Sequence, residues 1–347
     1  MITNMKKYWL LLISIGFIAT FLVACSGGDS ESSSGGAEAT SDDPIVFKTG
    51  LTVGDWAPQH TAMSVLEEVL EEKSGGTMVI EGYPDSQLGG EREMLEGVQQ
   101  GSLEIGLISS SVFAAFDERF TAIDIPYLVS SFEEAEAMMD GPVGEELDKM
   151  FEEIGMKNLA WGHNDFRIIS NSVKTIETPE DLNGIKMRVP ESQVLTDWYT
   201  NLGALSTTLP FPDIYNALQQ GVVDGQDNGP ILTHASKFTE HQDYVTVTKH
   251  QYSPVCFCIN LDLWNSLSEE QQSMLQEAAD EAAEEERKAI IDFHDMALEE
   301  MENAGVEVTH LTEEQLAEWQ ETGKAIAEKL SGEENPLLDV VLEEVGF

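Results

Sequence analysis

The chain of 347 residues is long enough for two domains, because a single hydrophobic core rarely grows to this size. It carries 64 acidic residues against 18 lysines and arginines, a formal net charge of −46, while 41% of its residues are hydrophobic. This charge argues against a nucleic-acid-binding protein and against electrostatic attachment to an anionic membrane. Because the acidic residues are spread along the chain, we interpret them as a solvated surface adapted to salt or alkaline surroundings.

Residues 1–24 have the parts of an export signal. Two lysines precede an apolar run over residues 8–23, which is short for a membrane span. The run ends in the sequence LVAC, which resembles the bacterial lipobox and implies lipidation of Cys25. A plain secretory signal and a membrane anchor are the alternatives. Cleavage would remove both lysines and make the net charge −48. Residues 25–43, rich in Ser, Gly and acidic residues, predict a flexible tether.

Strand-like and helix-like patterns alternate after the tether. Residues 45–53, 78–83 and 104–108 are predicted strands, and 61–73 and 91–100 have the apolar spacing of amphipathic helices. This order predicts a parallel sheet with helices packed on it.

A second α/β unit is expected further along the chain. Its predicted elements and those around it are helices 132–139 and 144–154, an extended segment 156–161, strands 166–170 and 186–189, helix 193–202, a return near 205–209, helix 212–221, a short strand 222–225 followed by a Gly/Asn-rich turn, and strands 245–248 and 255–259. Because this unit lies between two stretches that both look like parts of the first, the chain is expected to cross between domains more than once.

A long helix is predicted after Ser268, which forms a capping box with Gln271. The pattern continues without Pro or Gly to Asn303 and stops at Gly305. At about 1.5 Å per residue such a helix is roughly 50 Å long, so we expect it to span both domains. A coiled coil is the alternative, which the run AADEAAEEER disfavours because it breaks the spacing of large apolar residues.

Beyond Cys25, the cysteines are Cys256 and Cys258, in the strand-like run VCFCIN. Residues i and i+2 of a strand face the same side, but their geometry is poor for a disulfide. Two buried thiols are therefore expected, and a metal site would need partners that are not nearby.

Catalytic and cofactor motifs are not found. The chain has no GxSxG, HExxH or GxxxxGK[ST] motif and no GxGxxG after a strand, and its seven histidines are scattered. Asp224 and Asp227 resemble half of a calcium loop but lack its bidentate Glu. We therefore expect no enzyme, no cofactor and no metal.

Two of the five arginines point to anion binding. Arg167 and Arg188 are both expected at the ends of apolar strands, where two guanidinium groups could hold a carboxylate bidentately. The alternative is that each arginine pairs with a surface carboxylate. For Arg188, which lies between Met187 and Val189 and precedes Pro190, we prefer anion binding.

Several ordered motifs carry a family resemblance. The runs TPEDLNGIKMRVPES and LGAxxxxLPFPDIYNALQQGVVDGQDN resemble the solute-binding proteins of tripartite ATP-independent periplasmic (TRAP) transporters, DctP type. The resemblance extends to YPDSQLGGEREMLEGVQQGSLEIG, IPYL and SPVCFCINLDLWNSLSEEQQ, so that it covers nearly all of residues 45–330. It implies two α/β lobes that close on an organic acid, and a membrane permease that uses an ion gradient.

The resemblance also implies a binding site. Arg188 would hold the carboxylate, Arg167 would assist, and Asn228 would hydrogen-bond the ligand. Further contacts are implied from Phe211 in the second lobe and from Glu91 and Ser109 in the first. Apart from the resemblance, Trp161 and His60 are candidate ligand contacts. For these two residues, as for Trp56 and Tyr127, core or hinge packing is the other interpretation.

Two departures from the family pattern concern this site. Asp227 stands before Asn228 where the family usually has Glu, and Gly229 separates Asn228 from Pro230, which changes the expected path of the loop. Ser109 stands where some members carry a charged group, so that sialic acid is not favoured as a ligand.

Together these features predict a monomeric, lipid-anchored, extracytoplasmic solute receptor of a TRAP transporter. Its predicted lobes comprise residues 44–164 with 254–292, and 165–253 with 293–347. A sugar acid such as a uronate and a C4-dicarboxylate both remain possible ligands. A secreted enzyme acting on acidic sugars and the receptor of an ATP-driven importer are the alternative functions.

Overall fold

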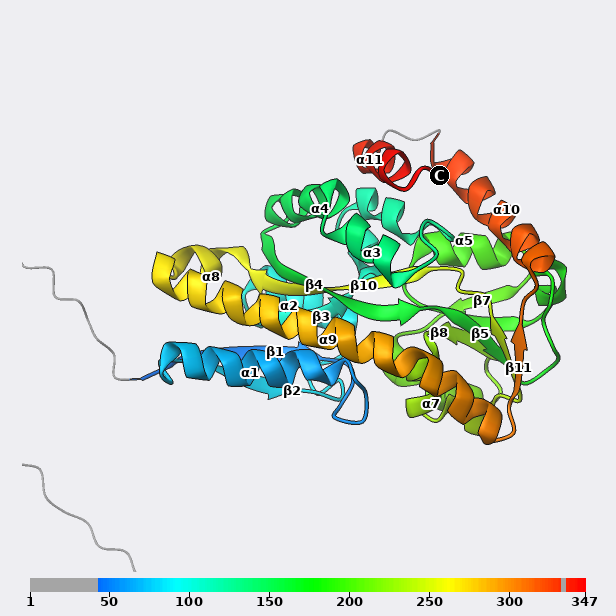
Figure 1. Ribbon diagram of the computed structural model, residues 1–347, viewed down its shortest axis with the longest axis horizontal. Helices are drawn as coiled ribbons and strands as arrows, with labels where there is room; N and C mark the ends of the chain where they lie inside the picture. Colours follow the sequence, from blue (N-terminus) through cyan, green and yellow to red (C-terminus); the bar gives the residue numbers. More distant parts are fainter. Residues whose placement is uncertain (1–42, 332–334) are drawn as a thin grey trace, which may run out of the picture. The chain divides into compact units, whose positions relative to one another are not determined.

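The computed structural model describes residues 43–331 and 335–347, and Asp43–Phe347 form one compact unit. The predicted export signal, Cys25 and nearly all of the predicted tether lie outside the described residues. The compact unit contains two β-sheets flanked by helices, which confirms the predicted α/β class (Figure 1).

Sheet A has the strand order β2-β1-β3-β10-β4. Its strands are β1 (Ile45–Leu51), β2 (Met78–Tyr83), β3 (Ile105–Ser109), β4 (Met156–Phe166) and β10 (Tyr252–Asn260). The pairing of β1 with β2 and β3 is parallel, as predicted from the alternating pattern, while β10 runs antiparallel to β3 and β4. The helices that follow strands of this sheet are α1 (His60–Ser74), α2 (Glu91–Gln100) and α8 (Leu261–Ser266).

Sheet B has the order β11-β9-β5-β8-β6-β7. Its strands are β5 (Ile168–Asn171), β6 (Lys186–Val189), β7 (Leu205–Thr208), β8 (Gly225–Asn228), β9 (Tyr244–Val247) and β11 (Glu307–His310). The predicted strand at 222–225 and the turn after it were wrong, because the polar run GQDN itself forms β8 in the middle of the sheet. Its buried side chains are stabilised by hydrogen bonds with neighbouring strands, as described below.

The remaining helical segments surround the two sheets. They are η1 (Ser110–Ala115), η2 (Glu118–Asp124), α3 (Phe132–Met139), α4 (Pro142–Glu153), η3 (Pro179–Leu182), α5 (Gln193–Asn201), η4 (Phe211–Asp213), α6 (Ile214–Gln219), α7 (Pro230–Ala235), η5 (Phe238–Glu240), α10 (Glu313–Leu330) and α11 (Pro336–Val345). The C-terminal helix α11 packs against η2, α3 and α4, whereas α10 packs against α5 and η3. The exact lobe boundaries stay a prediction.

Within the described ranges, no helix combines the length and apolarity that a membrane span requires.

The chain passes between the sheets more than once. Strand β4 ends at Phe166 and β5 begins at Ile168, so that Arg167 alone separates a strand of sheet A from a strand of sheet B. The chain returns through the segment between β9 and β10, where the oxygen of Gln251 accepts a hydrogen bond from the backbone N–H of Arg167 at 2.8 Å. The two crossing segments therefore lie side by side.

Helix α9 (Glu269–Asn303) has 35 residues and begins at the predicted capping box, in which Ser268 Oγ accepts from the N–H of Gln271. It packs against α1 and β4 beside sheet A and against α7 and β11 beside sheet B (Figure 1). A run of alanines on its buried face allows close contact with α1, since small side chains let two helix backbones approach. The helix therefore connects both halves of the compact unit.

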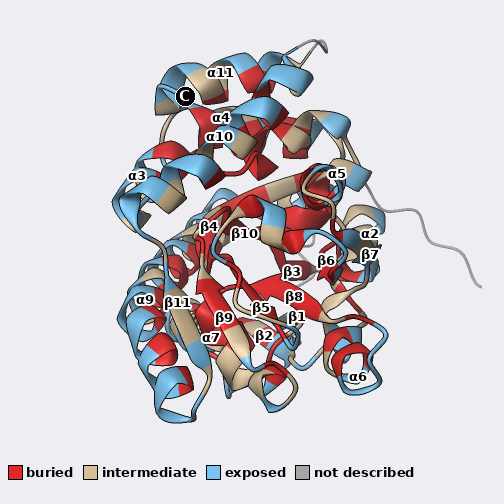
Figure 2. Cartoon of the chain, turned by 90° about the vertical axis from the view of Figure 1, so that its right-hand side faces the viewer, coloured by how far each residue is buried: buried red, intermediate tan, exposed pale blue. Residues whose placement is uncertain are grey.

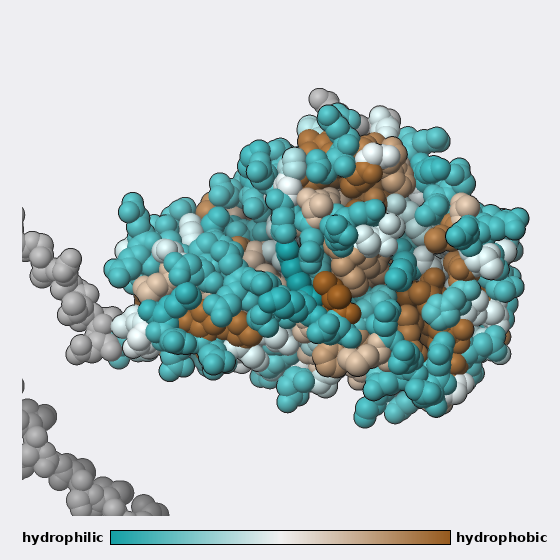
Figure 3. Space-filling view, viewed as in Figure 1, coloured by the Kyte–Doolittle hydropathy of each residue, from teal (hydrophilic) through white to brown (hydrophobic). Residues whose placement is uncertain are grey.

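Burial and surface composition agree with a globular protein of high acidic charge. The strands near the centre of both sheets are buried and the outer helices expose their polar faces (Figure 2). Hydrophilic residues cover most of the face seen in Figure 3, with apolar residues confined to scattered patches.

The structure joins Cys256 and Cys258 in a disulfide, where the sequence predicted free thiols. In a regular strand the Cα atoms of residues i and i+2 are about 6.6 Å apart. The pairing of β10 with β4 shifts register between these two cysteines, and their Cα atoms lie 5.4 Å apart. This irregularity moves the pair from the upper limit of the Cα separations found in disulfides to near their most common value of about 5.5–6 Å, which the sequence pattern did not reveal.

Candidate functional site

A small cavity of about 20 Å³ lies where elements of sheet A and sheet B meet. Its lining residues are Thr52, Glu91, Ser109, Ser111, Asn164, Arg167, Arg188, Pro190, Phe211, Asn228 and Leu232. The strands β1, β3, β6 and β8 all have their carboxyl ends at this cavity, so that many of the lining residues end a strand or follow one. Ligands of open α/β sheets bind at such strand ends. We call this space the arginine cavity.

Arg167 reaches the cavity from the junction between the two sheets, and its charge is already compensated. Its guanidinium donates to both carboxylate oxygens of Asp227 at 3.0 and 3.2 Å, and to the main-chain oxygen of Asp227 at 2.6 Å. Both side chains are almost fully buried. Although burial opposes ionisation, Arg167 and His250 hold the pKa of Asp227 below its usual value. Arg167 and Asp227 therefore form a buried, charge-neutral pair.

His250 completes this arrangement behind the cavity. Its Nε2 lies 3.2 Å from Asp227 Oδ2 and its Nδ1 lies 2.8 Å from the hydroxyl of Thr248. Burial lowers the pKa of His250, so the imidazole stays neutral near pH 7. The ring stacks on Trp198 with centroids 4.8 Å apart. These contacts fix the carboxylate that in turn orients Arg167.

Arg188 differs from Arg167 because no carboxylate of the described residues lies within ion-pair distance of it. It belongs to β6, between β8 and β7, and only 3% of it is exposed. Its Nε donates to the oxygen of Leu209 at 2.9 Å, and its Nη1 lies 3.4 Å from the oxygen of Asp227. Burial, followed by the nearby charge of Arg167, lowers the pKa of Arg188 to about 10. The group is therefore a buried cation that has only main-chain carbonyls as partners and is still charged at neutral pH.

Glu91 faces the arginines from the sheet A side. It is the first residue of α2, and its carboxylate accepts hydrogen bonds from the N–H of Ser109 at 3.0 Å and from the hydroxyl of Ser109 at 2.7 Å. The hydroxyl of Ser111 lies 3.4 Å away. The helix N-terminus favours a negative charge at this position. Within the cavity lining, sheet A thus contributes an anion and hydroxyl groups, whereas both cations come from the sheet B side.

Asn228 and Phe211 complete the sheet B side. Asn228 ends β8 opposite Ile168, and its Nδ2 donates to Gln226 Oε1 at 2.6 Å. Phe211 begins η4, immediately after the loop whose Leu209 oxygen accepts from Arg188, and its ring lies 6.0 Å from that of Phe238. An amide and an aromatic wall therefore stand beside the two guanidinium groups.

Six of the eight residues predicted from the sequence line the arginine cavity: Glu91, Ser109, Arg167, Arg188, Phe211 and Asn228. The other two, Trp161 and His60, do not. His60 begins α1, where its Nδ1 lies 3.1 Å from the hydroxyl of Ser64. Sequence reasoning missed Thr52, Ser111 and Asn164 in the lining. Thr52 lies near the end of the predicted first strand, residues 45–53, and this position was the available signal for it.

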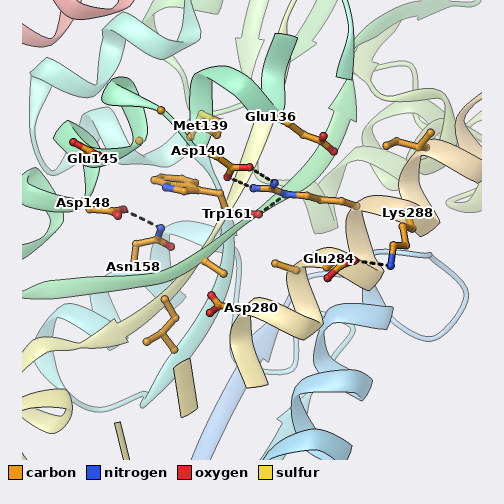
Figure 4. A pocket seen from close by; sticks show the side chains of 17 residues that line it. Glu136, Met139, Asp140, Glu145, Asp148, Asn158, Trp161, Asp280, Glu284 and Lys288 are labelled. Atoms are coloured by element: carbon orange, nitrogen blue, oxygen red, sulfur yellow. Dashed lines mark hydrogen bonds and ion pairs between the residues drawn. The ribbon is translucent and has the colours of Figure 1, made fainter. Parts of the chain in front are cut away.

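Trp161 lines a second, larger cavity of about 550 Å³ between α3, α4, β4 and α9 (Figure 4). Six carboxylate side chains line this space: Glu136, Asp140, Glu145, Asp148, Asp280 and Glu284. Its two cations already have anionic partners, because Arg287 binds Asp140 bidentately at 2.7 Å and Lys288 lies 2.9 Å from Glu284. A surplus of negative charge makes this cavity unsuited to an anion.

Sequence reasoning also missed a buried carboxyl behind the arginine cavity. Asp124 accepts hydrogen bonds from the hydroxyls of Ser192 at 2.6 Å and Ser110 at 3.2 Å, and from Gln251 at 3.2 Å. Burial raises the pKa of Asp124 to about 6. The contacts connect η2 with the N-terminus of α5 and with the segment that crosses between the sheets. Over the described ranges, no group of three His, Cys, Asp or Glu side chains is placed to hold a metal ion.

Comparison with known proteins identifies similar molecules. The model of the family described as bacterial extracellular solute-binding protein, family 7 (DctP), matches residues 49–333. The chain is 32% identical over 262 residues to the 2,3-diketo-L-gulonate-binding periplasmic protein YiaO of Escherichia coli (strain K12), covering 76% of this chain and 80% of that protein. It is 31% identical over 281 residues to the C4-dicarboxylate-binding periplasmic protein DctP of Rhodobacter capsulatus, covering 80% and 84%. The crystal structure of the sugar acid binding protein DctPAm from Advenella mimigardefordensis strain DPN7T, in complex with galactonate, superposes with a TM-score of 0.84 at 28% identity, covering 88% of this chain and 98% of that chain.

Proposed function

The chain belongs to family 7 of the bacterial extracellular solute-binding proteins, the DctP type of TRAP solute-binding protein, and from this premise we propose how it works. It captures one small organic acid between its two sheets and delivers it to a membrane permease. It is held outside the cell membrane by a lipid on Cys25, and it acts as a monomeric receptor without catalysis. The two lobes have the boundaries predicted from the sequence and close over the ligand.

The uncompensated charge of Arg188 supports this proposal most strongly. A buried cation with only carbonyl partners is unfavourable by itself, and a ligand carboxylate that binds it bidentately relieves that cost. Arg167 cannot provide the same charge, because Asp227 already neutralises it. Arg188 therefore anchors the carboxylate, while Arg167 positions Asp227 and adds a hydrogen bond. Asn228 hydrogen-bonds the same end of the ligand, and Phe211 packs against it.

Glu91 supports a sugar acid over a C4-dicarboxylate. A second ligand carboxylate would lie on the sheet A side of the cavity, where the lining offers the Glu91 carboxylate and no cation. Like charges at short range in a buried site repel strongly. Ligand hydroxyl groups, in contrast, can donate hydrogen bonds to Glu91, and they can both donate to and accept from the hydroxyls of Ser109 and Ser111. The site thus suits an acid with one carboxylate and a hydroxylated remainder.

Calorimetry with the purified protein tests the anchor. Galactonate, gulonate, glucuronate, erythronate and succinate form the ligand panel, and Arg188→Ala is the variant. We expect at least one acid to bind the wild type and the variant to lose affinity by a factor of about 100 or more, because a buried charge-assisted pair is removed. Arg92→Ala is the control, since Arg92 pairs with Glu96 on the surface. Undiminished binding by Arg188→Ala, or no binding of any acid to the wild type, would refute the proposal.

A further inference from the structure

A second small cavity adjoins the arginine cavity on its sheet A side. It also measures about 20 Å³, and Thr52, Glu91 and Asn164 line both spaces. Its other lining residues are Leu51, Val53, Gln59, Ala62, Leu107, Val255, Phe257 and Glu286. We call it the distal chamber, because Glu91, Thr52 and Asn164 stand between it and the residues that hold the carboxylate.

The chamber is lined by buried polar atoms that have no hydrogen-bond partner among the described residues. Gln59 is 4% exposed, and neither its Oε1 nor its Nε2 is paired. Glu286 is 1% exposed; its Oε2 accepts from the N–H of His163 at 2.9 Å, but its Oε1 has no partner. A buried polar atom without a hydrogen-bond partner destabilises the folded state. Unpaired buried polar groups are typical of functional sites, where a ligand or a bound water supplies the missing hydrogen bonds.

The local fold holds both groups in place. Gln59 directly precedes α1, and Glu286 lies in the middle of α9, which packs on α1 and on β4. Glu286 reaches the chamber because Gly162 in β4 has no side chain: a Cβ atom there would lie 2.8 Å from Glu286 Oε2. The positions of the two polar groups therefore depend on elements of the core and not on a surface loop.

The chemistry of the chamber selects a neutral group that both donates and accepts hydrogen bonds. Gln59 offers a donor and an acceptor, and burial raises the pKa of Glu286 to about 8, so its carboxyl is mostly protonated at neutral pH. A carboxylate would be repelled by the carboxylate of Glu91, and an ammonium would leave the amide N–H of Gln59 unpaired against apolar walls. A volume of about 20 Å³ exceeds the roughly 10–15 Å³ that one water-sized group needs, so one hydroxyl fits.

We propose that the distal chamber is a hydroxyl subsite, in which Gln59 and Glu286 bind the terminal hydroxyl of a sugar acid whose carboxylate lies at Arg188. This inference rests on the proposed function. The protein then distinguishes acids by the group at the end of the ligand opposite the carboxylate. An acid whose carbon chain is too short to pass Glu91 does not reach the chamber and gains no affinity from it. Gln59 and Glu286 thus determine specificity, while Arg188 supplies the anchor common to all acids.

The test compares ligands that differ at one group. From galactonate, gulonate and gluconate, the aldonate that binds most tightly is titrated beside its 6-deoxy analogue and beside erythronate and succinate. We expect the wild type to prefer the parent aldonate over the 6-deoxy compound by a factor of 10 or more. Gln59→Leu should weaken binding of the parent by a similar factor and leave the 6-deoxy compound and erythronate within about twofold. Glu286→Gln, which keeps a donor and an acceptor, should retain the preference.

Each outcome decides between the two claims. If no acid binds the wild type, the proposed function fails and the subsite fails with it. If acids bind but the parent and 6-deoxy compounds bind equally, the chamber holds a structural water only and the inference is overturned while the proposed function stands. The same holds if erythronate binds as tightly as the best aldonate, or if Gln59→Leu weakens all acids alike. If succinate binds as tightly as the best aldonate, the inference is overturned together with the preference for a sugar acid. The ligand comparison in the wild type remains decisive even if a variant does not fold.

Discussion

Replacing each buried arginine by methionine should affect folding stability to very different extents, although both line the same cavity. In Arg167→Met the carboxylate of Asp227 loses both guanidinium contacts and stays buried without its cation. Removing one partner of a buried ion pair typically costs about 3–5 kcal/mol. We therefore expect the free energy of unfolding of Arg167→Met to fall by that amount.

Arg188→Met should leave stability nearly unchanged. The pKa of Arg188 is lowered to about 10, which means that folding disfavours the charged guanidinium at every pH below that value. At about 1.4 kcal/mol per pKa unit, this burial costs about 3 kcal/mol. Loss of the hydrogen bond to the Leu209 oxygen costs about 1–3 kcal/mol, so the two effects largely cancel. Asp227 O keeps its bond from Arg167.

Urea unfolding of the ligand-free protein, followed by circular dichroism at pH 7, measures both variants. The double variant Arg167→Met/Asp227→Asn is the matched control, because it removes the orphaned charge and should recover most of the lost stability. The reasoning is refuted if Arg188→Met is destabilised as much as Arg167→Met, or if the double variant is no more stable than Arg167→Met alone.

Two further predictions concern a buried acid and the membrane anchor. The folded protein keeps a proton on Glu286 up to about pH 8, whereas the unfolded chain releases it at the ordinary, lower pKa of a glutamate. The free energy of unfolding of the wild type should therefore fall as pH rises through this window. The free energy of unfolding of Glu286→Gln, measured in urea relative to wild type, should increase by several kcal/mol between pH 5 and pH 9, on the order of 5 at most. A difference that stays constant with pH, or equals that of the exposed control Glu281→Gln, would contradict this reasoning. Cys25→Ala should move the protein from the membrane fraction to the soluble exported fraction on immunoblots, since lipidation provides the proposed anchor; unchanged fractionation would exclude it.

Local patterns predicted much of the fold. The capping box at Ser268 and the unbroken run to Asn303 predicted α9 to the residue, because cap chemistry and helix periodicity are encoded by neighbours in sequence. The parallel arrangement around β1 followed from alternating strands and helices. Strand β8 was misplaced because its polar side chains, which read as a turn, are buried and paired with distant strands. Functional sites are where local preference and final structure disagree.

The sequence predicted six residues that line the arginine cavity, but it did not reveal their charge partners. The sequence predicted Arg188 as the main carboxylate ligand and Arg167 as its assistant, but only the fold shows that Asp227, 60 residues beyond Arg167, neutralises Arg167. The same applies to α1, where sequence indicated His60 while Gln59 faces the chamber. Consecutive residues at a helix start point about 100° apart, and the sequence pattern did not resolve which of the two side chains enters the chamber.

The division of the lining between the two sheets has a consequence for how such receptors diversify. The groups around the anchor belong to sheet B and its junction, where Arg167 and Asp227 also contribute to stability. The groups that meet the rest of the ligand follow strands of sheet A and carry few of those contacts. If the proposed function is correct, substitutions at Thr52, Gln59 and Ser111 should therefore change which acid is bound without disturbing Arg188. The sheet B side of the lining can therefore stay constant while the sheet A side varies in sequence. A small library of variants limited to these three positions would be a suitable starting point for a sensor of a different acid.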